Sequence, residues 1–522
     1  MTDFYRTYSR RLVTNLPRVT SKSRIRENLL GLTLLGIVVA FFAGAGTAFS
    51  PLILAPVGAL LLGMIYLVST PIGTAKVLLG ALVVLVLAPI PTVVPTSIWF
   101  AGGSVYFADV MAALLIVAVV FSNLCPAVIR TVVLTIAGVV VLGLLVGALS
   151  HAKASLALAD ARGLLRLVAG ASGVAFLGEV DRAGTVKLLS RLAAVVTIWT
   201  ALVVALIAFL GVSSFGIRNS NAAVYTTSQS IVYDASRVTP DSGLTCVVVS
   251  AVLIVIRLSW GYSPYKWNLV WWLCVGAGVF VGLISYTRGH FIVFLLIIGL
   301  SLMVQPGRLA AFSRAICVTA GVVLFSVLGY YLVSTFSSAM ANSLTQPLIA
   351  FQGKVIGGLS LNTVEVDTSA LWRVRESDLA IDFLENNWIF GSGFGAPYRQ
   401  IVTGEIFQGS RGTTYIHSGY LWFLVKLGAM GSVVVAVILF QYFLMLWRSR
   451  NSEMGKWSAL CMVVLFSIAT QMVTSPTMIE NGNSVLVGII LGSGYLVSIR
   501  SLSNRKSCSS ANDLALSGRV EI

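Results

Sequence analysis

Residues 131–150 read TVVLTIAGVVVLGLLVGALS, twenty consecutive positions without a charged side chain. An α-helix needs about 20 apolar residues to cross the hydrocarbon core of a bilayer. Comparable blocks recur along most of the chain and predict fourteen membrane spans, or twelve if short pairs are re-entrant. The predicted spans lie at 29–48, 51–69, 75–94, 108–124, 131–150, 163–179, 190–212, 243–259, 267–286, 290–305, 313–335, 419–446, 457–475 and 484–500.

The composition excludes a soluble globular protein. Hydrophobic residues make up 57% of the 522-residue chain and charged residues only 10%, whereas soluble proteins carry about 25% charged residues. A soluble core could not bury this much apolar surface. The sequence therefore predicts an all-α polytopic membrane protein with about 12–14 transmembrane helices and one large, partly helical extracytoplasmic loop.

The net charge of +16 follows the predicted membrane topology. With the N-terminus in the cytoplasm and alternating spans, the inner segments collect 23 of the 35 Lys and Arg residues, and the short outer loops collect five. Cytoplasmic loops of membrane proteins carry such an excess. Both termini are therefore predicted inside the cell, and the positive charge does not indicate a nucleic-acid partner.

The spans divide the chain into five regions. Residues 1–28 form a basic cytoplasmic N-terminus, because this segment is too long for the n-region of a cleavable signal peptide. A bundle of about eleven spans occupies 29–335. A large outer loop covers 336–416, the C-terminal transmembrane helices cover 417–500, and a polar, Ser-rich cytoplasmic tail covers 501–522.

The large outer loop is the most informative region, because loops of this length are usually functional. Apolar residues at helical spacing predict a helix over 371–388 that lies on the membrane surface. After the loop, the span at 419–446 is longer than a crossing requires. Gly428 and Gly431 are expected to divide it into an interfacial part and a crossing part.

Metal and thiol chemistry have weak support in the sequence. The six cysteines are scattered without a CxxC pair, so no disulfide framework or thiolate metal site is indicated. Two acidic pairs, Glu365-x-Asp367 and Glu376-x-Asp378, could bind a cation through carboxylate oxygens. Solvated charges or arginine partners explain them more simply, so we expect no cofactor and a metal-independent protein.

Three groups of polar residues converge on the outer side. The first is Ser285-Tyr286-Thr287-Arg288-Gly289, between two spans. The second is Trp372-Arg373-Val374-Arg375-Glu376, followed by Gly391-Ser392-Gly393-Phe394-Gly395. The third is His417-Ser418 at the mouth of an apolar helix. Each also has a structural interpretation: a snorkelling arginine at a helix end, an exposed helix start with an internal Arg–Glu pair, and a structural histidine.

Taken together, the three groups resemble the O-antigen ligase and O-antigen polymerase superfamily over residues 285 to 446. That family has Ser/Thr-Arg-Gly at an outer helix end, matched by 287–289. It then has an arginine before a GxGxG segment, matched by Arg373 or Arg375 before 391–395. The last element is His-(Asn/Ser)-x-x-Leu-x-x-Leu-x-x-x-Gly-x-x-Gly, matched by 417–431. Where the family often has Trp four residues after the arginine, this chain has Ser377, which leaves the choice between the two arginines open.

The resemblance implies an inverting glycosyltransferase whose donor is a glycan on undecaprenyl pyrophosphate. Arg288 and Arg373 would hold the diphosphate, since the planar guanidinium pairs with phosphate oxygens and stays charged. His417 would act as general base on the acceptor hydroxyl. These three residues are the expected catalytic residues.

Further charged residues are expected to bind the pyrophosphate or the glycan: Arg375, Glu376, Arg411, Arg162, Arg166 and Arg218. For Arg162, Arg166 and Arg218 the alternative is pairing with Asp160, with Asp234 or with a lipid phosphate. No metal site is included among these residues.

The resemblance leaves two functions open, and the rest of the sequence weighs against others. A polymerase joins lipid-linked repeat units, whereas a ligase moves the finished glycan to a lipid core or another acceptor. A transporter or flippase would show inverted repeats and helices broken near the midplane, and neither is found. A structural scaffold would leave the three groups of polar residues unexplained.

The expected partners are the lipid-linked donor, a glycan or lipid acceptor, membrane lipid, a flippase and a chain-length regulator. The expected location is the bacterial cytoplasmic membrane.

Overall fold

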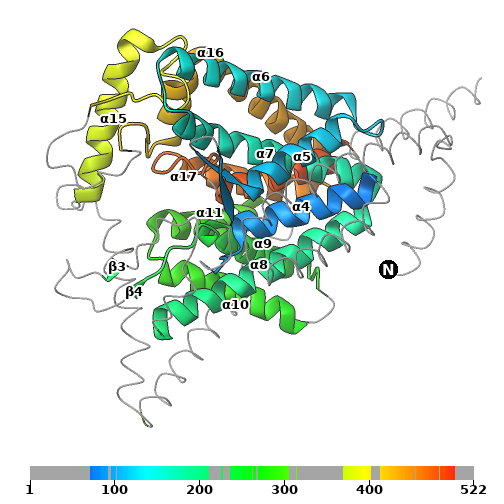
Figure 1. Ribbon diagram of the computed structural model, residues 1–522. Helices are drawn as coiled ribbons and strands as arrows, with labels where there is room; N and C mark the ends of the chain where they lie inside the picture. Colours follow the sequence, from blue (N-terminus) through cyan, green and yellow to red (C-terminus); the bar gives the residue numbers. More distant parts are fainter. Residues whose placement is uncertain are drawn as a thin grey trace, which may run out of the picture.

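The computed structural model describes twelve main helices, eleven of them labelled in Figure 1, and two very short strand pairs. The described residues are 71–91, 96–100, 103–210, 225–226, 236–261, 263–265, 268–304, 368–400, 412–452, 454–480 and 482–499, with isolated positions elsewhere. The expected spans at 29–48, 51–69 and 313–335 lie outside these residues, as do both terminal regions.

The helices follow the hydrophobic blocks of the sequence. They are α4 (Pro71–Leu87), α5 (Phe107–Val120), α6 (Ala127–Leu149), α7 (Ala154–Val180), α8 (Arg182–Leu210), α9 (Gly243–Trp260), α10 (Asn268–Ile284), α11 (Arg288–Val304), α15 (Thr368–Asn387), α16 (Gly419–Ser449) and α17 (Gly455–Gln471). A final helix covers Gly482–Ile499. The strands are β1 (Ser97–Phe100) with β2 (Gly103–Tyr106), and β3 (Tyr225–Thr226) with β4 (Ser236–Arg237).

Six of the described helices are long and apolar enough to cross a membrane by length and composition, and four more are shorter apolar helices. With so little strand content in the part of the chain described, the protein is an all-α polytopic membrane protein. This confirms the fold class expected from the sequence.

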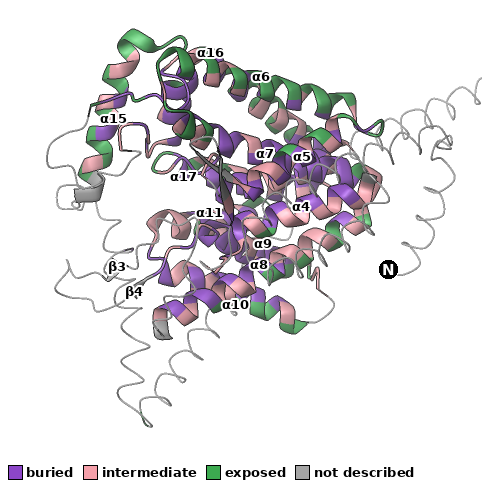
Figure 2. Ribbon diagram, viewed as in Figure 1, coloured by how far each residue is buried: buried purple, intermediate pink, exposed green. Residues whose placement is uncertain are grey.

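Helix α7 is the central element of the bundle. Of its most apolar 18-residue window, 78% is buried within the protein, against 28% for α6, and Figure 2 shows the same contrast between the mainly purple α7 and the green outward side of α6. Close approach is possible because small residues line α7. A Cβ atom at Gly163 would come 2.0 Å from the Ile479 carbonyl oxygen, so only glycine fits there.

One span begins earlier than expected. The sequence predicted an outer loop at 151–162 before a span at 163–179, but α7 begins at Ala154 and includes Asp160 and Arg162. The prediction was wrong because these charged residues have ion-pair partners on other elements. Paired in this way, they are compatible with a helix inside the bundle.

The long span after the outer loop is broken at Gly428, as the sequence predicted. Its φ of 62° and ψ of −175° interrupt α16, whereas Gly431 continues the helix. The part from 429 to 449 is by itself about 30 Å long at 1.5 Å per residue, enough to cross the hydrocarbon core. If this part crosses the membrane, the break lies near one membrane surface, whereas the helices of transporters are broken near the midplane.

The broken ends of α16 bind the segment 388–396, which we call the strap. Because Gly428 leaves the helical conformation, the Ala429 and Met430 amides donate to the carbonyls of Trp388 and Ile389, at 2.7 and 3.2 Å. The Ser392 amide donates to the Val425 carbonyl at 2.6 Å. These hydrogen bonds satisfy backbone groups that the break would otherwise leave unpaired.

The strap's three glycines allow it to pass between helices. Gly391, Gly393 and Gly395 all have positive φ, between 68° and 76°. A Cβ at Gly393 would come 2.0 Å from the Gly147 nitrogen in α6, and one at Gly395 would come 2.3 Å from the Ala157 nitrogen in α7. The Gly-rich motif is therefore a packing element that joins the outer loop to three helices.

Candidate active site

The polar groups gather where several helix ends meet. The starts of α9, α11, α16 and the final helix lie against the end of α17 and the turn that follows it. Gly289 packs on Gln471, Gly419 on Met472 and Gly482 on Asp241. These are the ends that the expected topology places outside the membrane, so all three groups predicted from the sequence lie on one side of the bundle.

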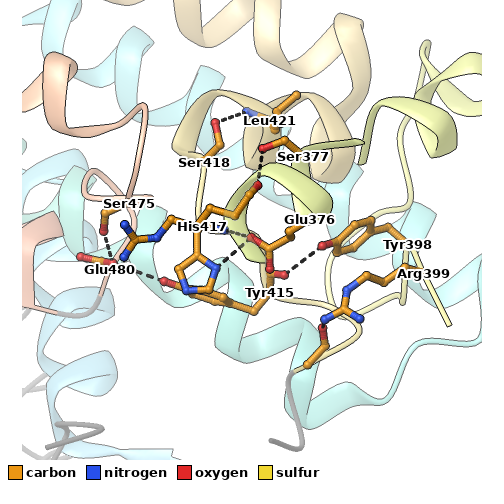
Figure 3. A network of polar contacts seen from close by, with 12 residues as sticks. Glu376, Ser377, Tyr398, Arg399, Tyr415, His417, Ser418, Leu421, Ser475 and Glu480 are labelled. Atoms are coloured by element: carbon orange, nitrogen blue, oxygen red, sulfur yellow. Dashed lines mark hydrogen bonds and ion pairs between the residues drawn. The ribbon is translucent and has the colours of Figure 1, made fainter. Parts of the chain in front are cut away.

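The centre of the candidate site is a His–Glu pair. The Nδ1 atom of His417 lies 2.8 Å from the Oε2 atom of Glu376, and the His417 backbone amide donates to the same oxygen at 2.7 Å. Glu376 is only 2% exposed, whereas the His417 side chain is 23% exposed. Figure 3 shows the imidazole beside the carboxylate. An imidazole that donates its Nδ1–H in this way carries its basic lone pair on Nε2.

The pairing depends on α15 and α16. Glu376 projects from the middle of α15, the helix expected at 371–388, and His417 directly precedes the Ser418 N-cap of α16. The Ser418 hydroxyl accepts from the Leu421 amide at 3.4 Å, which fixes the start of the helix. The packing of α15 against the start of α16 therefore brings two residues 41 positions apart into contact.

A second carboxylate lies beside the pair. The Tyr415 ring packs edge-on against the His417 ring, with 5.0 Å between centroids, and its hydroxyl donates to Glu480 Oε1 at 3.4 Å. Burial raises the pKa of Tyr415 well above its usual value, the charges of Glu480 and Glu376 add to the effect, and the positive charge of Arg373 opposes it. Tyr415 therefore stays protonated and connects the two carboxylates electrostatically.

The two arginines of α15 differ in their relation to this group. Arg373 and Arg375 are both exposed. Only the charge of Arg373 acts on the Tyr415 hydroxyl. Arg373 therefore has the more direct electrostatic link to the His417 group.

Arg288 begins α11 and is half-buried. Just before it, Tyr286 adopts a positive φ of 45°, a conformation that non-glycine residues rarely take. The adjacent Gly289 lies against Gln471, three residues before the turn that carries Ser475 and Glu480. Arg288 is thus held on the same side of the bundle as the His417 group.

Arg162 and Arg166 share one carboxylate deep in the bundle. Their Nε atoms lie 2.7 and 2.8 Å from the two oxygens of Asp109, at the start of α5. Both arginines are buried, at 6% and 2% exposure, and Arg162 also stacks over the Tyr106 ring. The structure shows that both arginines pair with a carboxylate, and the shared partner is Asp109, which the sequence did not suggest. Asp234 lies outside the described residues.

Asp160 has a different role, which the sequence did not reveal. Its Oδ2 atom accepts from the Gly395 amide of the strap at 2.8 Å and lies 3.2 Å from the Lys426 Nζ atom. Lys426 is fully buried and also donates to the Ala396 carbonyl at 2.8 Å. This buried ion pair joins α7, the strap and the broken end of α16. Arg218 and Arg411, expected to bind substrate, lie outside the described residues.

Asp241 was missed in the sequence because it is a single acid in a long loop. Gly482 packs directly against it. Burial raises the pKa of Asp241 to about 8, the nearby charge of Glu480 raises it further, and Arg166 lowers it. At neutral pH Asp241 is therefore mainly a neutral carboxylic acid.

The raised pKa predicts a pH-dependent effect of Asp241→Asn on stability. The pKa of Asp241 is higher in the folded protein than in the unfolded chain. Such an acid stabilises the folded protein most at pH values below its pKa in the unfolded chain, and this contribution is lost as the pH rises toward 8. The variant lacks the ionising group, so its melting temperature is expected to rise relative to the wild type between pH 5 and pH 9. Thermal unfolding in detergent at several pH values measures this. A difference that does not change with pH would contradict it.

No metal-binding constellation is found in the described part of the chain. No group of three or more His, Cys, Asp or Glu side chains there is arranged to hold an ion. Of the two acidic pairs in the loop, Glu365 and Asp367 lie outside the described residues, and Glu376 is bound to His417.

A comparison with known proteins finds a family match over the region that carries the site. Residues 273–436 match the family described as O-antigen ligase. The matched region runs from α10 through α11, the outer loop and α15 into α16, so it contains Arg288, Arg373, Glu376 and His417. No curated protein matches the chain significantly. The matched region contains the His417–Glu376 pair, and it supports the resemblance of this part of the chain to the O-antigen ligase and polymerase superfamily.

Proposed function

We propose that the protein is an inverting glycosyltransferase at the outer face of the bacterial cytoplasmic membrane that polymerises undecaprenyl-pyrophosphate-linked repeat units. The observation that carries this proposal is the His417–Glu376 pair, at 2.8 Å, inside the matched domain. It supplies a base that a buried carboxylate orients, which is the arrangement that activates a hydroxyl group.

The chemistry follows from this arrangement. The acceptor hydroxyl oxygen attacks the anomeric carbon of the donor sugar and forms the new glycosidic bond. The bond from that carbon to the pyrophosphate oxygen breaks, and its electron pair leaves with undecaprenyl pyrophosphate. The hydroxyl proton passes to His417 Nε2, and Glu376 stabilises the imidazolium through Nδ1. Attack opposite the leaving group inverts the anomeric configuration.

The leaving group requires positive charge. Arg288 and Arg373 are proposed to bind the diphosphate and stabilise the charge that develops on it. Their positions support this: Arg373 acts electrostatically on Tyr415 beside the base, and Gly289, the residue after Arg288, packs against Gln471 at the end of α17. Arg162 and Arg166 are proposed to add a positive electrostatic potential, because two positively charged side chains share the single negative charge of Asp109.

The second candidate function is a ligase that transfers the finished glycan to a lipid core or other acceptor. It is favoured by the description of the matched family as O-antigen ligase. Carrier-lipid and polysaccharide profiles of a deletion strain separate the two. Single repeat units accumulate on the carrier lipid if a polymerase is lost, and long glycan accumulates there if a ligase is lost. A profile identical to the wild type would contradict both.

Glu376→Gln tests the orienting carboxylate. The introduced amide can donate to Nδ1, which would leave the proton on Nε2 and abolish its basicity. We expect the transfer rate to fall by about 10² to 10⁴-fold, the scale of a carboxylate-to-amide change beside a catalytic histidine, and the pH–rate profile to change. Glu385→Gln makes the same change on an exposed residue of α15 and is the control. Equal rates for the two variants would show that Glu376 does not orient the base.

A further inference from the structure

Glu480 is held rigidly at the edge of the site. Its Oε1 atom accepts hydrogen bonds from Ser475 and from Tyr415, and its Oε2 atom accepts one from Asn483 Nδ2 at 2.7 Å. Figure 3 shows Glu480 on the far side of Tyr415 from Glu376. The carboxylate is therefore held by three hydrogen bonds, and it fixes the orientation of the residues around it.

Asn483 is the first of these. Because a carboxylate only accepts hydrogen bonds, the bond to Glu480 requires the Asn483 nitrogen to face Glu480. The opposite atom, Oδ1, is buried and has no hydrogen-bond partner in the structure described. The residue is only 6% exposed. The Asn483 Oδ1 atom is thus a hydrogen-bond acceptor that points away from Glu480 and receives no hydrogen bond from the described residues.

Asp241 is the second. Gly482, the residue before Asn483, packs on the Asp241 carbonyl and Cβ. The Asp241 carboxyl lies close enough to Glu480 and Arg166 to sense both charges. Its Oδ2 atom is also buried and unpartnered among the described groups. Two unpaired polar groups from different elements therefore both lie near Glu480, which is linked to His417 through Tyr415.

We propose that Asp241 and Asn483 form a subsite for sugar hydroxyls of the acceptor glycan. This inference rests on the proposed glycosyltransferase function. The unpaired Asn483 oxygen requires a ligand with hydrogen-bond donors, and hydroxyl groups supply them. A phosphate would be repelled by Glu480 and offers no donor, so the subsite is not a second site for the carrier lipid.

A divalent cation is the main competing ligand, because carboxylate and amide oxygens are its usual ligands. The positive charge of Arg166 beside Asp241 opposes it. The neutral form of Asp241 at physiological pH opposes it too. A carboxylic acid suits a sugar better, because it both donates to and accepts from a hydroxyl.

The test uses the full-length protein in lipid nanodiscs. The donor is radiolabelled lipid-linked glycan from the source cells, and the acceptor probe is the same repeat-unit oligosaccharide released from its lipid by mild acid. Initial rates are measured against acceptor concentration for Asp241→Ala, Asn483→Ala and the exposed control Glu385→Ala. We expect the acceptor KM to rise about tenfold in the first two variants, because each loses one strong hydrogen bond to the acceptor. The kcat should stay within about threefold of the wild-type value, and the donor KM should not change. Asp241→Asn, which keeps an acceptor oxygen, should recover most of the affinity.

Other outcomes would overturn the subsite. A fall in kcat with unchanged acceptor KM would show a structural role, and a raised donor KM would place the carrier lipid there. A loss of wild-type activity in EDTA that Mg²⁺ or Mn²⁺ restores would show a cation site. If the wild type transfers no sugar, the proposed function fails. Saturation-transfer NMR with the oligosaccharide alone then tests the subsite: binding by the wild type but not by Asp241→Ala supports it, and equal signals contradict it.

Discussion

His417→Asn is expected to lower glycan transfer by about 10² to 10⁴-fold, the contribution of a general base, while the protein stays folded. The asparagine amide can still donate to Glu376 Oε2, now 2.8 Å from the imidazole, so the loop keeps its anchor. It has no lone pair basic enough to take the proton of the acceptor hydroxyl. Transfer rates in nanodiscs, with the membrane level of the variant checked by immunoblot, measure the effect.

His151→Asn is the matched control for this prediction. His151 lies exposed in the turn between α6 and α7 with a positive φ of 55°, a conformation that asparagine tolerates. We expect wild-type activity from it. If His417→Asn also kept full activity at a normal membrane level, His417 would be structural and the proposed mechanism would have to be abandoned.

Gly147→Ala is expected to destabilise the folded protein by about 3 kcal/mol, the upper end of the usual cost of overpacking. A Cβ at Gly147 would lie 2.1 Å from the Phe394 carbonyl oxygen. No side-chain rotation relieves a clash with backbone, so the strap must shift. The shift would break the hydrogen bond from the Phe394 amide to the Gly143 carbonyl and the stacking of Phe394 on Trp422. Transfer activity should fall as well, because the strap joins the helices that carry Glu376 and His417.

Gly138→Ala on the same helix provides the comparison. No atom lies within 4 Å of a Cβ built there, so the melting temperature in detergent should stay within a degree or two of the wild type. Equal melting temperatures for the two variants would mean that the strap does not pack on α6 as described.

The sequence predicts the helices of this fold better than the contacts between them. Hydropathy alone locates the spans, because each must bury its own backbone polar groups in helical hydrogen bonds. It also predicts α15 from helical spacing and the break from Gly428. The start of α7 was misplaced because the partners of its charged residues lie far along the chain. Asp109 is 53 residues before Arg162, and no local pattern connects them.

The candidate site shows the same limit. The resemblance points to His417, Arg288 and Arg373 without assigning a partner to the histidine. Glu376 was expected to contact the substrate, and the structure adds a contact that the sequence did not predict, because its Oε2 atom lies 2.8 Å from His417 Nδ1. Asp241, Glu480 and Asn483 carry no motif, because their relation arises only where three helix ends and a turn meet. The Gly-rich segment was noted, but its role as a strap depends on positive φ angles and backbone neighbours that spacing cannot reveal.

The central claim is that this protein transfers a lipid-linked glycan, and reconstitution tests it most directly. Purified protein in nanodiscs is supplied with labelled undecaprenyl-pyrophosphate-linked repeat units, without nucleotide sugar and with EDTA present. A ladder of glycan lengths on the carrier lipid, with release of undecaprenyl pyrophosphate and an inverted anomeric linkage, is the predicted result. Donor that remains a single, intact lipid-linked unit, even when a lipid acceptor is added, would contradict the account.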